Sequence, residues 1–160
     1  MIFGIGTDIV QVSRMTALLE RYGERFPRRI LTGDEFREFS ASKQPAYFLA
    51  KRFAAKEAAV KALGTGFKRG LQPCHIGVGH TERGQPFLEW QGRANELVRL
   101  LGVGRGLLSL ADEKDYALAF VTLLTEREDI RSDLKSGERA LNPHKLPDNG
   151  SEGHGLEERG

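Results

Sequence analysis

The chain has a single cysteine, no long apolar run and no basic segment ahead of its first apolar residues. Cys74 has no second cysteine to pair with, which excludes an intrachain disulfide, and no Cys/His zinc cluster is present. The four histidines lack metal-ligand spacing. No apolar run approaches the length needed to cross a bilayer, and the N-terminus does not resemble a signal peptide. We therefore expect a soluble chain in a reducing, cytoplasmic setting, with no membrane partner.

Several common catalytic and binding motifs are also missing. The sequence has no Gly-x-x-x-x-Gly-Lys-Ser/Thr phosphate loop, and Gly64 and Gly66 follow a predicted helix instead of preceding one. Ser109 and Cys74 have no neighbouring signature of an activated nucleophile. No recognised nucleic-acid motif is present. These absences argue against a P-loop enzyme, a triad hydrolase and a nucleic-acid partner.

Charge is distributed unevenly along the chain. A length of 160 residues suits one domain with a tail, and apolar residues make up 39%. The net charge of +2 conceals a basic first half, since residues 1–72 carry 13 Lys/Arg against 7 Asp/Glu. Residues 126–160 carry 6 against 9 and have few large apolar side chains. The first half can therefore attract an anionic partner, and we interpret 126–160 as a flexible charged tail that follows a domain at 1–125.

Strand and helix patterns alternate along residues 1–125. Their order predicts an α+β fold with a mainly antiparallel sheet packed against one long helix. A helix cap is expected at Ser13, and a flexible break is expected at 102–106. The predicted elements are strands at 2–10, 76–78, 86–90, 107–110 and 116–124, and helices at 14–22, 24–31, from 32–35 onward, 45–63 and 92–101, with a possible short helix at 126–136.

An acid interrupts the apolar N-terminal strand. Alternation puts Gly4, Gly6, Asp8 and Val10 on one face of it. A buried carboxylate is costly without a compensating charge or hydrogen bonds, and glycines within a strand often mark a close approach. We expect these glycines to clear room beside Asp8. Either a structural, hydrogen-bonded acid or a metal ligand satisfies this pattern.

The long helix carries a second acid together with a lysine. Glu57 and Lys61 stand four residues apart, so they share a face, and Gly64 is placed to end the helix. An exposed ion pair is the common interpretation of this spacing. The functional interpretation lets Glu57 and Asp8 share a hard cation such as Mg²⁺ while Lys61 meets a phosphate oxygen.

A run of arginines lies in the predicted helices near the N-terminus. Arg14, Arg21, Arg25 and Arg28 have the spacing of one helical face. A solvated face is the default interpretation of this pattern. The sharper one is a docking surface for an acidic protein, and the apolar contacts would then be Met15, Leu18 and Phe26.

Two segments together resemble a known family. Residues 4–10, Gly-Ile-Gly-Thr-Asp-Ile-Val, and residues 53–66, Phe-Ala-Ala-Lys-Glu-Ala-Ala-Val-Lys-Ala-Leu-Gly-Thr-Gly, are similar to the short bacterial branch of the 4'-phosphopantetheinyl transferases, the holo-acyl-carrier-protein synthases. Residues 109–117 resemble the closing segment of that family. The resemblance covers about residues 1–125 and keeps the order and spacing of both motifs.

The resemblance implies a fold, an activity and a set of partners. It implies the 4'-phosphopantetheinyl transferase fold and transfer of 4'-phosphopantetheine from coenzyme A to a serine of apo-acyl carrier protein, in support of fatty acid biosynthesis. Adenosine 3',5'-bisphosphate is the other product. It also implies Mg²⁺, with Mn²⁺ as an alternative, and a homotrimer with active sites between subunits.

Individual residues receive roles from the same resemblance. Asp8 and Glu57 are the expected metal ligands and, with Lys61, the catalytic residues. The arginine helix is expected to dock the acidic carrier protein. Many members have a histidine where this chain has Asp112, so that histidine's contact with the adenosine-side phosphate cannot be transferred. The residues expected to contact coenzyme A are Lys61, Gly64, Thr65, Lys43 and Arg52.

Two non-catalytic interpretations stay open beside this one. The arginine face is also suited to binding nucleic acid or an anionic protein without catalysis. A structural oligomer in which Glu57 and Lys61 form an ordinary ion pair is the third interpretation.

Overall fold

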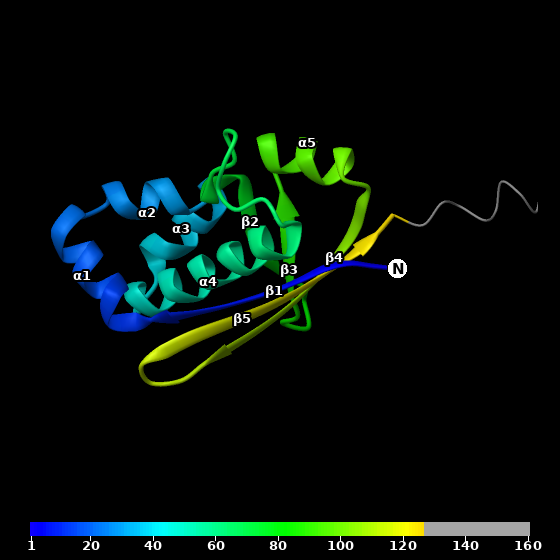
Figure 1. Ribbon diagram of the computed structural model, residues 1–160. Helices are drawn as coiled ribbons and strands as arrows, with labels where there is room; N and C mark the ends of the chain where they lie inside the picture. The colour runs from blue at the N-terminus through cyan, green and yellow to red at the C-terminus, as the bar shows by residue number, and fades with distance from the viewer. Residues whose placement is uncertain (127–160) are drawn as a thin grey trace, which may run out of the picture. The chain divides into compact units, whose positions relative to one another are not determined.

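A computed structural model describes residues 1–126. They form an antiparallel sheet, a long helix packed across it and smaller helices around that helix (Figure 1). The predicted tail from residue 127 onward, and with it most of the possible helix at 126–136, lies outside the described residues. The elements in order are β1 (Ile2–Gln11), α1 (Val12–Tyr22), α2 (Arg25–Ile30), α3 (Gly33–Ala41), α4 (Pro45–Leu63), the 3-10 turn η1 (Pro73–His75), β2 (Ile76–His80), β3 (Pro86–Trp90), α5 (Gly92–Leu100), β4 (Val103–Asp112) and β5 (Tyr116–Thr125).

Antiparallel pairing organises the strands. The main sheet has the order β1–β5–β4, and β2 pairs with β3 in a separate two-stranded sheet. Helix α4 lies along β1 and β5 and buries an alanine-rich surface against them (Figure 1). This arrangement confirms the predicted α+β class with a mainly antiparallel sheet against a long helix.

The predicted flexible break at 102–106 is wrong. Gly102, at φ 66°, makes the turn, and β4 starts directly afterwards at Val103. A register shift between Val103 and Arg105 absorbs Gly104 into the ladder with β5. The glycines that suggested a loop therefore mark a turn followed by an irregularity within a strand.

Glycines in β1 set how closely α4 approaches the sheet. A Cβ on Gly4 would collide with the carbonyl oxygen of Ala62, and one on Gly6 would collide with that of Ala58. The expectation that these glycines clear room beside Asp8 is therefore corrected. They admit the helix backbone, and the close approach in turn brings Lys61 up to the strand.

Local signals at the helix ends are partly as predicted. Gly64 ends α4 in the left-handed conformation at φ 72°, as expected of a C-terminal glycine. The cap predicted at Ser13 is wrong, because α1 already begins at Val12, whose backbone N–H donates to the Asp115 carbonyl. At α3 the side chains of Thr32 and Glu35 form a reciprocal capping box.

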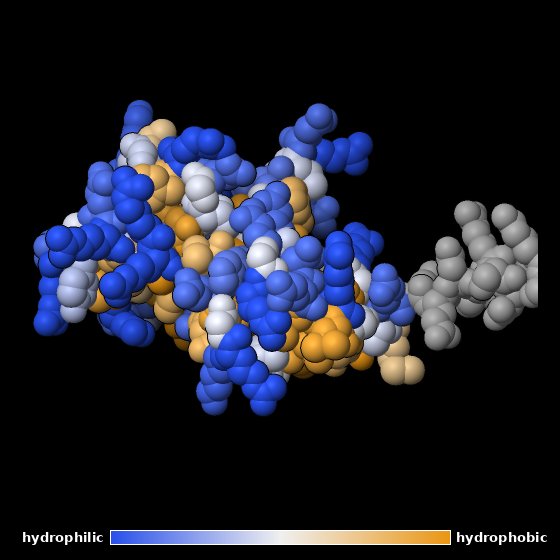
Figure 2. All heavy atoms as spheres, turned by 90° about the horizontal axis from the view of Figure 1, so that it is seen from above, coloured by the Kyte–Doolittle hydropathy of each residue, from blue (hydrophilic) through white to orange (hydrophobic). Residues whose placement is uncertain are grey.

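The two faces of the main sheet differ in what covers them. The side seen from above, where the helices lie, is mainly hydrophilic at its surface, with apolar patches between the charged side chains (Figure 2). On the other face, Ile5 is 61% exposed, Ile9 59% and Phe120 44%. Leu107 and Leu118 are also exposed on this face, because the pairing of β1, β5 and β4 places these side chains on the same side of the sheet. This face is an apolar surface that nothing within residues 1–126 covers.

No helix among the described residues is both long and apolar enough to span a membrane.

Candidate active site

An acid and a base from distant parts of the chain meet where α4 crosses β1. The Lys61 ammonium donates to Asp8 Oδ1 at 2.7 Å and to the Thr7 carbonyl at 3.1 Å. Asp8 is half-buried, and the strand face that it shares with Gly4 and Gly6 meets α4. The glycine-lined approach of α4 makes this long-range contact possible.

Glu57 lies one helical turn before Lys61 and does not pair with it. No salt bridge within 4.0 Å joins these two side chains in the part of the chain that the structure describes, whereas the Lys61–Asp8 pair does form. The ordinary Glu57–Lys61 ion pair, on which the structural interpretation rested, is therefore absent from this arrangement. Burial raises the pKa of Glu57, the Asp8 carboxylate raises it further, and Lys61 acts in the opposite direction.

The donor set at this point suits a hard divalent cation. Mg²⁺ typically takes one or two protein carboxylates and completes its shell with water and phosphate oxygens. Asp8 and Glu57 supply two carboxylates; the pKa of Glu57 is raised first by burial and then by the Asp8 carboxylate, and a cation would relieve both effects. Within residues 1–126 no group of three or more His, Cys, Asp or Glu side chains forms a denser metal site. The residues present therefore fit magnesium held together with a phosphate-bearing substrate.

A cluster of basic side chains lies on the other flank of α4. A hollow of about 410 Å³ brings Arg52 and Lys51 of α4 together with His80 of β2 and Asp112 of β4. Phe48, Gly84, Pro86 and residues 108–110 complete its lining. Arg52 was expected to contact coenzyme A. Lys51 and His80 escaped the sequence reasoning because they join Arg52 only through the folding together of three separate elements.

The Arg52 guanidinium is held firmly in this wall. It is buried, its Nη2 donates to Glu38 Oε2 at 3.0 Å, and it lies over the Phe48 ring at 4.5 Å. Its Nε lies 3.5 Å from Glu35 Oε1 and makes no hydrogen bond. The Lys51 ammonium is 3.5 Å from Asp112 Oδ2, so the Asp112 carboxylate partly neutralises this cation.

Helical geometry separates the two sites within one chain. Arg52 and Lys61 are nine residues apart, which is about 2.5 turns, so their side chains leave opposite flanks of α4. The sheet register agrees, since Asp8 of β1 and Leu110 of β4 both pair with Ala119 of the central strand. Their backbones are thus two strand spacings, about 10 Å, apart, with α4 over the row between them.

The remaining expected coenzyme A contacts fall in different places. Gly64 and Thr65 line a hollow of about 290 Å³ just beyond the end of α4, and the Thr65 hydroxyl is buried there without a hydrogen-bond partner. Lys43 lies exposed in the connection between α3 and α4 and lines none of these hollows. Lys68, Arg69, Leu97, Leu100 and Leu101 complete the lining beside Gly64.

The expected docking arginines occupy two helices. Arg14 and Arg21 belong to α1, whereas Arg25 and Arg28 belong to α2, and Gly23 at φ 55° ends the first helix between them. The four therefore do not lie on one continuous helical face. A hollow of about 490 Å³ between the two helices is lined by Leu18, Tyr22, Arg25, Phe26 and Arg29.

Two details of this surface differ from expectation. Met15 is 1% exposed and belongs to the core, so it is not an apolar docking contact. Arg28 donates to Glu24 at 3.1 Å and lies over the Phe36 ring, which turns it toward α3. Leu18 and Phe26 are only partly buried, and both line the hollow between α1 and α2.

A buried ion pair behind the site was missed altogether. The Lys56 ammonium is fully buried and donates to Glu35 Oε2 at 2.6 Å and to the carbonyls of Ile76 at 2.6 Å and Pro73 at 3.1 Å. Glu35 also accepts from the backbone N–H groups of Thr32 and Val78. Burial lowers the pKa of Lys56, and Glu35 opposes that lowering. The available signals were the capping-box position of Glu35 and a lysine within a run of alanines.

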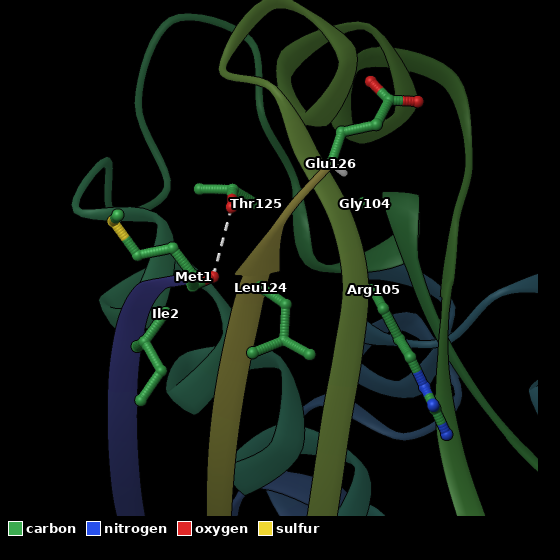
Figure 3. A pocket seen from close by; sticks show the side chains of 7 residues that line it. All are labelled: Met1, Ile2, Gly104, Arg105, Leu124, Thr125 and Glu126. Atoms are coloured by element: carbon green, nitrogen blue, oxygen red, sulfur yellow. Dashed lines mark hydrogen bonds between the residues drawn. The ribbon is translucent and has the colours of Figure 1, made fainter. Parts of the chain in front are cut away.

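A larger hollow lies at the end of the sheet where β1 begins and β5 ends. Its volume is about 600 Å³, and Figure 3 shows its lining, with the Thr125 hydroxyl donating to the Met1 carbonyl at 3.2 Å. The side chains of Arg105 and Glu126 point in different directions there (Figure 3). None of the predicted site residues lines it, so size alone does not identify the site.

Comparison with known proteins identifies the family to which the chain belongs. Residues 4–121 match the family model of the 4'-phosphopantetheinyl transferase superfamily. The chain belongs to this superfamily, as the resemblance of residues 4–10 and 53–66 indicated.

Particular relatives carry a more specific name. A holo-[acyl-carrier-protein] synthase of Nitrosococcus oceani is 83% identical over 151 residues, which cover 94% of this chain and 97% of that protein. That alignment necessarily extends well past residue 126, so this relative has a counterpart to much of the tail.

Solved structures of the same name share the fold. The Neisseria meningitidis holo-[acyl-carrier-protein] synthase has a TM-score of 0.74 at 44% identity and covers 78% of this chain and 100% of its own. A holo-(acyl-carrier-protein) synthase of Bacillus anthracis, solved in complex with CoA (3',5'-ADP), has a TM-score of 0.66 at 33% identity over 79% of this chain and 99% of its own.

Proposed function

We propose that this chain transfers 4'-phosphopantetheine from coenzyme A to a serine of apo-acyl carrier protein and releases adenosine 3',5'-bisphosphate. The observation that carries the proposal is the convergence of Asp8, Glu57 and Lys61 at the crossing of β1 and α4. Two carboxylates and a lysine at one point form a site for a cation and a phosphate group. Membership of the superfamily and the names of its close relatives give the substrate pair.

The chemistry assigns a separate task to each side chain. The serine Oγ loses its proton and bonds to the phosphorus that carries pantetheine, while the bond from that phosphorus to the bridging oxygen breaks. Asp8 and Glu57 would hold Mg²⁺, with Mn²⁺ as the alternative, and a bound ion would supply charge neutralisation for the diphosphate. Lys61 exchanges its bond to Asp8 for one to a diphosphate oxygen and stabilises the leaving group. Glu57 is a poor base when it is a ligand, which favours a water molecule as the acceptor of the serine proton.

Coenzyme A also contacts residues outside this triad in the proposal. Arg52 binds an anionic group of it in the hollow beside β4, and Gly64, Thr65 and Lys43 provide further contacts. Arg52 and Lys61 leave opposite flanks of α4, so a molecule that reaches both kinds of site does so between two copies of the chain.

A homotrimer is the proposed assembly. It accounts for the apolar outer face of the main sheet, where Ile5, Ile9 and Phe120 are exposed, and it lets the metal flank of one copy face the coenzyme A flank of the next. Sedimentation equilibrium of the full chain tests it. We expect a trimer, and we expect Ile9→Glu to dissociate it, because a charge in that face disrupts apolar packing. A wild-type monomer at assay concentration would rule the assembly out.

The carrier protein is proposed to dock on α1 and α2. Arg14, Arg21 and Arg25 supply positive charge there, and the hollow containing Leu18 and Phe26 supplies apolar contact. Arg28 contributes charge in spite of its pairing with Glu24. Service to fatty acid biosynthesis and a cytoplasmic location belong to the same proposal.

A transfer assay tests the function directly. The full chain is incubated with coenzyme A, MgCl₂ and an apo-acyl carrier protein, and intact-protein mass is measured. We expect the carrier to gain one phosphopantetheine group, and we expect the gain to require Mg²⁺ and the target serine. No gain by any apo-carrier, together with salt-sensitive binding to nucleic acid, would replace the proposal with the binding-module interpretation.

A further inference from the structure

The turn between β4 and β5 contacts two helices that lie far from it in the sequence. It comprises residues 113–115 and lies beside the junction of β1 and α1 (Figure 1). The hydroxyl of Tyr47, in the first turn of α4, donates to the Lys114 carbonyl. The Asp115 carbonyl accepts the backbone N–H of Val12, the first residue of α1, at 2.8 Å. The β4–β5 turn therefore connects the start of α4 with the start of α1.

The start of α1 has no cap of its own. Gln11 at the N-cap makes no side-chain hydrogen bond to the helix, and the first turn of α1 carries no acid. The bond from Val12 to the β4–β5 turn satisfies one of the N–H groups that the start of a helix leaves without an intrahelical partner. The first turn of α1 is therefore positioned in part by the β4–β5 turn.

Helix α4 contacts this hairpin at two points on one of its faces. Tyr47 and Lys51 are four residues apart, so their side chains leave the helix in the same direction. Tyr47 reaches the Lys114 carbonyl, and the Lys51 ammonium lies 3.5 Å from Asp112 at the end of β4. The ring of Tyr47 also packs against the hydrophobic core, which restrains its hydroxyl. The helix of the candidate active site thus fixes the β4–β5 turn.

We propose that Tyr47 is a positioning residue for the carrier protein, because it holds the β4–β5 turn and, through that turn, the first turn of α1 with Arg14. This inference rests on the proposed function, in which the acidic carrier protein docks on α1 and α2. Arg14 is exposed and follows Val12 by two residues, so it moves with the start of the helix. A displaced guanidinium pairs less well with the carboxylates of an acidic partner.

This role acts on one of the two substrates. Arg14 would contact the carrier away from the reacting serine, so its contribution is the same in the bound state and in the transition state. Loss of such a contact raises KM and leaves kcat unchanged. A general loss of structure, by contrast, acts on both substrates and on kcat.

The first test removes the hydroxyl and keeps the ring. Transfer by the full chain with coenzyme A, MgCl₂ and an apo-acyl carrier protein gives kcat and the KM of each substrate for Tyr47→Phe. We expect the KM of the carrier to rise up to about fivefold, the scale of one net hydrogen bond. We expect kcat, the KM of coenzyme A and the melting temperature to stay close to the wild-type values. Ser40→Ala is the matched control, because its hydroxyl donates to the Phe36 carbonyl within α3 at 2.9 Å.

A double-mutant cycle then asks whether Tyr47 acts through Arg14. Tyr47 bonds the β4–β5 turn and not Arg14 itself, so independent actions would give additive losses. We expect Tyr47→Phe to have little further effect on the KM of the carrier in an Arg14→Ala background. Arg21 lies in the last turn of α1, about 10 Å along the helix from Arg14. In an Arg21→Ala background the effect of Tyr47→Phe should therefore be retained in full.

Contrary results would overturn the inference in different ways. An unchanged KM of the carrier in Tyr47→Phe would show that the bond to the β4–β5 turn does not position the docking helix. Equal losses for both substrates, with a lower melting temperature, would show a general structural effect. Additive losses with Arg14→Ala would show that Tyr47 acts independently of α1. Absence of transfer by the wild type is a separate failure, since it removes the proposed function itself.

Discussion

Lys56 and Lys61 of α4 contrast in how their charges and those of the nearby acids are satisfied. In the Glu35–Lys56 pair, three acceptors meet the three ammonium donors, and the carboxylate accepts two backbone N–H groups besides. Lys61, by contrast, bonds Asp8 and not Glu57, and the Asp8 carboxylate repels that of Glu57. The first set of charges is complete within the chain, whereas the second is not.

The contrast separates a structural role from a functional one. A buried charge with every partner in place holds α3, α4 and β2 in register and has no capacity left for a ligand. Burial raises the pKa of Glu57, and the Asp8 carboxylate raises it further, which makes Glu57 a candidate functional group. Both lysines lie in α4, and residue type alone does not tell their two roles apart.

Removing one member of the complete pair should have the largest effect. We expect Glu35→Gln to lower the free energy of unfolding by about 3–5 kcal/mol, because it leaves the Lys56 charge buried without its counter-charge. Urea unfolding of the full chain measures this. Glu38→Gln is the control on the same helix, and its partly exposed side chain should cost under about 1 kcal/mol. Equal midpoints for the two variants would place the Glu35–Lys56 pair among weak surface interactions.

Removing an acid of the incomplete set should affect activity instead of stability. We expect Asp8→Ala to reduce transfer to the carrier by about 10²–10³-fold, the scale of several kcal/mol of lost charge stabilisation, while the fold survives. Rates at limiting Mg²⁺ and thermal melting provide the two readouts. Glu113→Ala, an acid in the β4–β5 turn, should retain full activity. Full activity of Asp8→Ala at limiting Mg²⁺ would refute the metal role of Asp8.

The glycine contact that brings the site together can be tested separately. We expect Gly6→Ala to destabilise the chain by about 1–3 kcal/mol, because its Cβ meets the Ala58 carbonyl and pushes α4 from β1. Gly33→Ala is the matched control, since a Cβ there meets nothing within 4 Å. Similar chemical-denaturation midpoints for both variants would contradict the close approach of helix and strand.

The smallest predicted effect is a gain in stability, whereas the substitutions of Glu35 and Gly6 reduce stability. The pKa of Glu57 is raised in the fold, so its ionisation opposes folding as the pH rises from the unfolded value through the folded one. We expect Glu57→Gln to raise stability at neutral pH by under about 1 kcal/mol without Mg²⁺. Melting temperatures at pH 4 and pH 7 give the sign. A loss of stability at pH 7 would mean that Glu57 is satisfied like Glu35.

Local signals predicted most elements because they act within a few residues. Gly64 ends α4 through its own backbone freedom, and Thr32 begins α3 through a side chain that reaches three residues along. Ser13 failed as a cap because α1 begins two residues earlier than predicted, at Val12, whose backbone N–H makes a long-range bond to the Asp115 carbonyl. The extra length of β4 at Val103 depends on its partner strand β5.

The candidate site divides in the same way. The motifs around Asp8, Glu57 and Lys61 were legible because residue type and spacing carry them. Lys51 and His80 were not, because β2 and β4 reach α4 only in the folded chain. Met15 was interpreted as a surface contact because an amphipathic pattern does not determine which side chains at the edge of the apolar face are buried in the fold.

By itself the sequence determined the chemistry available to this protein: an acid in the first strand, and a second acid, a lysine at helical spacing and a glycine stop that are near neighbours in the long helix. Only the tertiary structure decided which charges are already satisfied. That outcome depends on contacts across more than fifty residues, such as Lys61 with Asp8, and on the burial that makes an unpaired charge costly.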